Sequence, residues 1–167
     1  MITTYWEDLV PGSVRQLGTV SPTREEIIEF AQKFDPQPFH LTDEGGQASL
    51  FGGLCASGWH TCSMAMSLMV RNFLLTSSSL GSPGLENIKW LKPVYPGDTL
   101  RLEHEILDSR PSKSKPDVGL TRTMWRMYNQ DEILVMHMEG ASMFRRRHPA
   151  THTDTVTDIS SDTPSSS

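Results

Sequence analysis

The chain has 167 residues, 37% of them hydrophobic, and a formal net charge of −5. This length suits one domain of ordinary size, and the negative charge argues against a general nucleic-acid or anionic-membrane surface. No apolar run reaches the roughly 18 residues that a membrane-spanning helix needs. The first eight residues lack the basic and apolar segments of a signal peptide, so we expect a cytoplasmic protein.

The first predicted elements are a strand over Ser13–Val20 and a helix that follows it. Thr23 and Glu26 have the spacing of a capping box, in which each side chain satisfies a free backbone N–H of the first turn. The next apolar residues recur at helical spacing: Ile27, Phe30, Ala31 and Phe34. Asp35-Pro36 ends this helix, because a residue before proline is pushed out of helical geometry.

Residues 35–52 form an irregular segment with some local helical character, and a second helix is expected to begin near Ala56-Ser57-Gly58. Its apolar stripe consists of Trp59, Cys62, Met66, Met69 and Phe73. A helix this apolar around its girth is expected to be buried. The turn-rich residues Thr76–Gly84 predict a loop after it.

From residue 85 the hydrophobic period changes from the helical value to two, which is typical of strands. Strands are predicted over Leu85–Leu91, Thr99–Leu107, Leu120–Asn129 and Glu132–Phe144. Short connections favour antiparallel pairing, so the fold class is α+β, with a curled antiparallel sheet around one long central helix. We expect a single domain over residues 1–147 and a disordered tail over 148–167, because ten of the last twenty residues are Ser or Thr.

The most informative segment for chemistry is Asp35-Pro36-Gln37-Pro38-Phe39-His40. It holds an acid and an imidazole on a connector stiffened by two prolines. Two such groups that reach one water molecule can remove a proton from it and return a proton elsewhere. The alternative is purely structural: Asp before Pro commonly forms an Asx turn, and a loop His commonly serves as a hydrogen-bonding residue.

A second segment, Phe51-Gly52-Gly53 to Ala56-Ser57-Gly58, leads with glycines into the central helix. A helix start offers free N–H groups and a positive dipole end, and glycine lets a ligand approach that backbone closely. Such a site can polarise a carbonyl group. Equally, the glycines can serve only to bring the helix close to the sheet.

Together these segments resemble the signature of the MaoC-like dehydratases, which include the (R)-specific enoyl-CoA hydratases and have the hot-dog fold. The segment from Ile88 to Leu100, with Pro93 and Pro96-Gly97-Asp98, resembles a third landmark of that family. The resemblance covers roughly Trp6 to Arg147. It implies that Asp35 and His40 are the catalytic pair.

The resemblance also implies that the backbone N–H of Gly58 faces the carbonyl oxygen of a thioester substrate. Gln37 stands where the family more often has Asn. We interpret it as a substrate-binding residue that changes the shape of the substrate that the site accepts. Phe39, Phe51 and Trp59 are further candidates for the wall of the substrate site, although packing is the more common use of such residues.

The expected activity is reversible addition of water to the double bond of a 2-enoyl thioester, carried by coenzyme A or an acyl-carrier protein. No metal or redox cofactor is expected, since coenzyme A is part of the substrate and no metal-binding CxxC or HExxH spacing is present. A lone hot-dog unit leaves an open sheet edge, so we expect a homodimer or a dimer of dimers. The alternatives are a hot-dog thioesterase and a non-catalytic acyl-CoA-binding protein.

Overall fold

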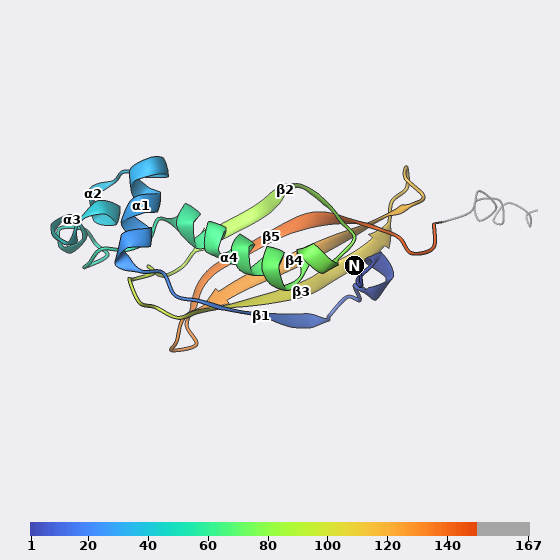
Figure 1. Cartoon of the computed structure of the whole chain (residues 1–167), viewed down its shortest axis with the longest axis horizontal. Coiled ribbons are helices and arrows are strands. Elements are labelled where there is room, and N and C mark those ends of the chain that lie inside the picture. Colours follow the sequence, from blue (N-terminus) through green and yellow to red (C-terminus); the bar gives the residue numbers. More distant parts are fainter. Residues whose placement is uncertain (150–167) are drawn as a thin grey trace, which may run out of the picture.

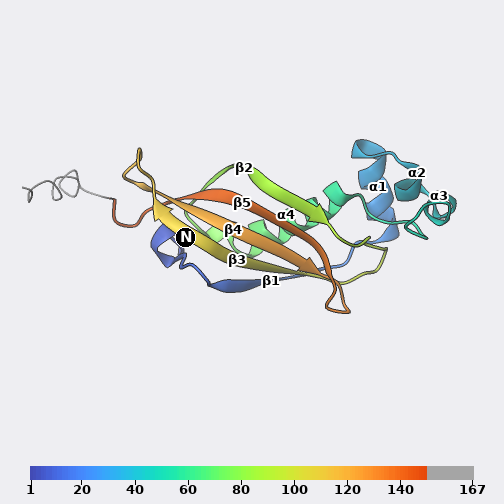
Figure 2. The ribbon, with the colours of Figure 1, turned by 180° about the vertical axis from the view of Figure 1, so that it is seen from behind.

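A computed structural model describes residues 1–149, which form a curled five-stranded sheet wrapped around one long helix (Figure 1). The elements, in chain order, are η1 (Trp6–Asp8), β1 (Val14–Val20), α1 (Arg24–Phe34), α2 (Pro38–Leu41), α3 (Asp43–Gln47), α4 (Gly58–Asn72), η2 (Leu74–Thr76), β2 (Ser79–Trp90), β3 (Leu100–Pro111), β4 (Val118–Tyr128) and β5 (Leu134–Arg145). The helices α1–α3 gather beyond one end of the sheet, where α4 begins (Figure 2).

The strand order is β1-β3-β4-β5-β2, and every neighbouring pair is antiparallel. This arrangement confirms the predicted α+β class and the hot-dog fold. Thr23 and Glu26 form the predicted capping box at the start of α1, and Asp35 follows its last residue. The division into a domain over 1–147 and a tail over 148–167 stays a prediction, because residues 150–167 lie outside the described part of the chain.

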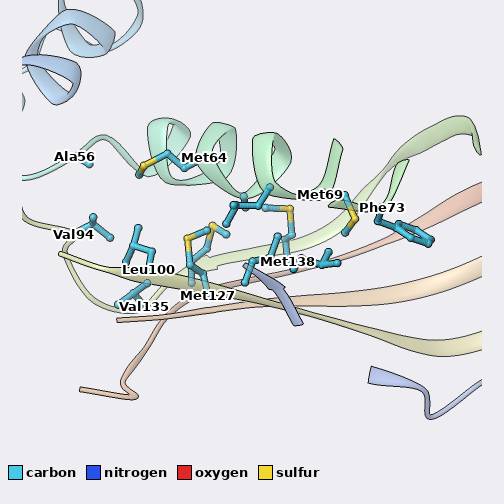
Figure 3. Packing of buried hydrophobic residues seen from close by; sticks show 14 of the residues in the cluster. Ala56, Met64, Met69, Phe73, Val94, Leu100, Met127, Val135 and Met138 are labelled. Carbon is cyan, nitrogen blue, oxygen red and sulfur yellow. The ribbon is translucent and has the colours of Figure 1, made fainter. Parts of the chain in front are cut away.

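The core lies between α4 and the concave face of the sheet (Figure 3). Met64 and Met69 of α4 reach toward Met127 and Met138 of the strands, and all four are buried. Such unbranched side chains fill irregular gaps well.

The predicted buried stripe of α4 is wrong in part. Met69 and Phe73 are buried as expected, but 55% of Trp59 and 46% of Met66 are exposed. The buried residues of α4 are His60, Thr61, Met64, Ala65, Leu68 and Met69, of which the last four belong to the hydrophobic core. Because α4 is apolar on more than one face, its sequence pattern does not indicate which face contacts the sheet.

The predicted loop over Thr76–Gly84 is also wrong in its second half, because β2 begins at Ser79. The backbone of β2 pairs with β5 from Ser79 opposite Phe144 onward, with register shifts around Gly81 and Gly84. These two glycines have φ values of 104° and 148°, which side chains rarely permit. Pairing with β5 therefore extends the strand through residues whose composition favours a turn.

Gly46→Ala is expected to destabilise the protein by about 1–3 kcal/mol, the usual cost of overpacking. Gly46 is buried in α3, and a Cβ there would lie 2.1 Å from the backbone carbon of Gly53. The matched control is Gly53→Ala, whose Cβ would make an ordinary 3.6 Å contact with Tyr95. Urea unfolding measures both variants, and equal unfolding midpoints would contradict the packing described here.

Candidate active site

Asp35 and His40 lie side by side at the end of the sheet where α1, α2 and α4 meet. Asp35 caps the C-terminus of α1, and the turn through Pro36 and Pro38 places His40 in the single turn of α2. His40 Nε2 lies 3.5 Å from Asp35 Oδ2. The His40 side chain is 7% exposed and that of Asp35 is 19% exposed, so both are largely shielded from solvent.

A backbone carbonyl orients the His40 ring. His40 Nδ1 lies 2.7 Å from the carbonyl oxygen of Cys55. Since a carbonyl oxygen only accepts hydrogen bonds, we assign the proton of the neutral ring to Nδ1. Nε2, which faces Asp35, then carries a lone pair in the neutral ring and a proton in the imidazolium.

Two side chains donate to the Asp35 carboxylate. Ser57 Oγ donates to Oδ2 at 2.7 Å, and Gln37 Nε2 donates to Oδ1 at 2.7 Å. Burial raises the pKa of Asp35, but these hydrogen bonds and the nearby His40 ring outweigh it, so the pKa lies below its ordinary value. Asp35 is therefore an ionised acceptor at neutral pH.

Gly58 is the first residue of α4, next to the buried Ser57 that caps the helix by accepting from the Trp59 N–H. Within residues 1–149, the Gly58 N–H has no hydrogen-bond acceptor. A Cβ at Gly58 would lie 2.5 Å from Cε2 of Trp90. The Gly58 amide is therefore free at the positive end of α4. The absence of a side chain at this position makes room for the Trp90 ring.

These groups line one cavity of about 410 Å³. All seven residues predicted for the site line it: Asp35, Gln37, Phe39, His40, Phe51, Gly58 and Trp59. Phe39 and Phe51 pack edge to face with ring centroids 5.2 Å apart, and Trp59 and Trp90 do so at 5.3 Å. The cavity thus combines an acid–imidazole pair and a free amide with aromatic walls.

Sequence reasoning missed the parts played by Ser57, Trp90 and the Cys55 carbonyl. Ser57 and Trp90 lie inside the segments that carry the family resemblance, but nothing in their spacing shows that one reaches Asp35 and the other covers Gly58. Gln37, predicted to bind substrate, lines the cavity and also donates a hydrogen bond to Asp35.

Burial raises the pKa of the Cys55 thiol to about 11, so this cysteine is protonated at neutral pH.

Residues 1–149 contain no cluster of three or more His, Cys, Asp or Glu side chains placed to hold a metal ion. In the same part of the chain, no helix has both the length and the apolar character needed to cross a bilayer.

Known proteins resemble this chain in sequence and in fold. The family model described as MaoC like domain matches residues 10–124. The crystal structure of the MaoC-like dehydratase from Rhodospirillum rubrum is 36% identical, with 87% of this chain and 99% of that chain covered and a TM-score of 0.82. The R-hydratase PhaJ1 from Pseudomonas aeruginosa is 20% identical, with 97% and 95% covered and a TM-score of 0.67. The uncharacterized protein YdeM of Bacillus subtilis (strain 168) is 26% identical over 140 residues, which are 84% of this chain and 98% of YdeM.

The fold and the cavity thus define a hot-dog protein with an acid–imidazole site. Because the family model spans more than half of the chain, and because a solved member is 36% identical over most of it, the chain belongs to the MaoC-like dehydratase family.

The hydrogen bonds to Asp35 lead to a prediction that is independent of activity. Removal of either donor, in Ser57→Ala or Gln37→Met, is expected to raise the Asp35 pKa. The reason is that these hydrogen bonds stabilise the charged carboxylate more than the protonated carboxyl group. Carbon-13 NMR titration of labelled aspartate carboxyls measures this pKa, and the other aspartates serve as internal references. An unchanged Asp35 titration in both variants would show that these contacts do not hold the charge.

Proposed function

We propose that this protein is a hydro-lyase that reversibly adds water to the double bond of a 2-enoyl thioester, carried by coenzyme A or an acyl-carrier protein. One observation carries the proposal: Asp35 and His40 Nε2 face each other at 3.5 Å in a cavity that is also lined by Gly58, whose N–H has no acceptor within residues 1–149. Membership of the MaoC-like dehydratase family supports it, and the likeness to an R-hydratase makes the (R)-3-hydroxyacyl product the expected one.

In the proposed hydration, the substrate water lies in the cavity beside the pair and contacts both the Asp35 carboxylate and His40 Nε2. The Asp35 carboxylate takes one proton from this water as its oxygen bonds to C3 of the enoyl group. The electron pair of the double bond moves toward the thioester carbonyl, whose oxygen accepts a hydrogen bond from the Gly58 N–H. His40 Nε2, protonated at the start, then delivers its proton to C2.

The cycle closes when the proton held by Asp35 passes to His40, which restores the carboxylate and the imidazolium. Dehydration is the same sequence in reverse. The Cys55 carbonyl holds the His40 ring throughout, so that only Nε2 exchanges the proton. Each step is a proton transfer or a carbon–oxygen bond change, and the proposal therefore needs no metal or redox cofactor.

Incubation with crotonyl-CoA tests the proposal directly. The expected result is loss of the enoyl-thioester absorbance without release of a free thiol, with 3-hydroxybutyryl-CoA as the product. Thiol release would instead identify a thioesterase. Binding of crotonyl-CoA without turnover would identify a non-catalytic acyl-CoA-binding protein, and either outcome would refute the hydro-lyase.

The predicted homodimer or dimer of dimers remains part of the proposal. The observation that supports it is the edge strand β2, whose residues other than Ser79 and Ile88 are all exposed. A long exposed edge strand is a ready template for pairing with another chain. Light scattering is expected to give a mass of at least two chains, and a stable monomer at assay concentration would contradict this. The cytoplasmic location stays a prediction.

A further inference from the structure

A second cavity, of about 480 Å³, lies along the exposed side of α4. From the helix it is lined by Trp59, Cys62, Ser63, Met66, Met69 and Phe73, and from the strands chiefly by Leu85, Trp125, Met138 and Phe144. In the described part of the chain, no Asp, Glu, Lys or Arg contributes to its lining. His104 also lines it, and burial together with the charge of Arg15 lowers the pKa of that ring to about 4, so His104 is neutral at physiological pH. The cavity therefore suits an uncharged apolar ligand.

Among residues 1–149, Trp59 alone lines both this apolar cavity and the catalytic cavity. Its ring packs edge to face against Trp90, with centroids 5.3 Å apart and planes at 75°. Trp90 in turn lies directly against Gly58. The two indole rings therefore form a wall beside the amide that is proposed to bind the thioester carbonyl.

The position of this wall bears on the length of the acyl group. When the thioester carbonyl lies at the Gly58 N–H, the acyl chain occupies a cavity whose wall includes Trp59. A short chain needs no further space. A longer one needs additional apolar space, and Trp59 also lines the apolar cavity that can supply it.

We propose that Trp59, packed on Trp90, separates the catalytic cavity from the apolar cavity and thereby restricts this enzyme to short 2-enoyl thioesters. The apolar cavity is then an acyl-chain site that opens when the Trp59 ring is removed. This inference rests on the proposed hydro-lyase function and specifies its substrate class.

The test compares kcat/KM for trans-2-enoyl-CoA esters of four, eight and twelve carbons. In the wild type we expect kcat/KM to fall steeply from four to twelve carbons. In Trp59→Ala the ratio of the twelve-carbon to the four-carbon value is expected to rise at least about ten-fold, since each methylene group moved into an apolar site contributes about four-fold. Trp59→Leu serves as a second, more conservative opening of the wall.

Two control variants distinguish the effect of the Trp59 ring from the effect of the apolar cavity. Trp59→Phe keeps an aromatic ring in place, so its length profile is expected to stay close to that of the wild type. Met66 lines the apolar cavity but not the catalytic cavity. Met66→Trp added to Trp59→Ala is therefore expected to fill the new space and to remove the gain with twelve carbons.

The outcomes distinguish this inference from the function on which it rests. Hydration of no chain length by the wild type would refute both. Hydration of four-carbon substrate with the same length profile in wild type, Trp59→Ala and Trp59→Leu would overturn the inference alone. An unchanged profile accompanied by a lower mass in Trp59→Ala would also overturn it, since the apolar face would then bind a second copy of the chain.

Discussion

Asp35→Asn is expected to lower kcat/KM for hydration of crotonyl-CoA by about 10³-fold, within the range that a positioned general base contributes. The amide is nearly isosteric with the carboxylate but cannot accept a proton from water. Ser57 still has an oxygen to which it can donate, so the start of α4 is expected to keep its position. The assay measures initial rates across pH, because a mere shift of the profile would also lower the rate at one pH.

The control is Asp131→Asn, which makes the same chemical change at an exposed position in the turn before β5. It is expected to retain wild-type activity. Thermal unfolding of both variants checks that the loss in Asp35→Asn is not a loss of folded protein. If Asp35→Asn keeps more than a tenth of the wild-type kcat/KM at every pH, Asp35 is not the base.

Gly58→Ala is expected to lower kcat for the same reaction by about 10²- to 10³-fold, the usual effect of removing one oxyanion-binding donor. The new Cβ would lie 2.5 to 2.8 Å from three atoms of the Trp90 indole, so that either the ring or the first turn of α4 must move. Movement of the helix turn would take the Gly58 amide away from the proposed position of the thioester oxygen, and movement of the ring would change the wall beside it. Steady-state kinetics with crotonyl-CoA are expected to show the loss mainly in kcat.

A double-mutant cycle tests whether the contact with Trp90 is the cause. Trp90→Ala removes the ring against which the new methyl group would press. The double variant Gly58→Ala/Trp90→Ala is therefore expected to lose less than the sum of the two single effects, expressed as free energies of activation. Additive losses would mean that the substitution acts on the amide without the Trp90 contact.

Local features of the chain were predictable because they depend on neighbours in sequence. Each of these features involves residues only a few positions apart: the Thr23–Glu26 capping box, the helix end at Asp35-Pro36 and the short connector from Asp35 to His40. The family resemblance added the roles of Asp35, His40 and Gly58, and all three residues line one cavity. Fold class followed from the change of hydrophobic period after the central helix.

Other features depend on contacts between distant segments. Ser57 and Asp35 are 22 residues apart, and only the packing of α4 against the end of α1 lets the hydroxyl reach the carboxylate. The start of β2 at Ser79 depends on backbone pairing with Phe144 rather than on local composition.

The same distinction explains α4 and the two cavities. The sequence by itself determined that α4 is a long apolar helix that begins near Ala56-Ser57-Gly58, because helical period is a local property. Only the tertiary structure decided that Ala65 and Leu68 belong to the core while Trp59 and Met66 border open space. Which face of a helix is buried depends on the surface that packs against it, and the strands that form this surface lie elsewhere in the chain.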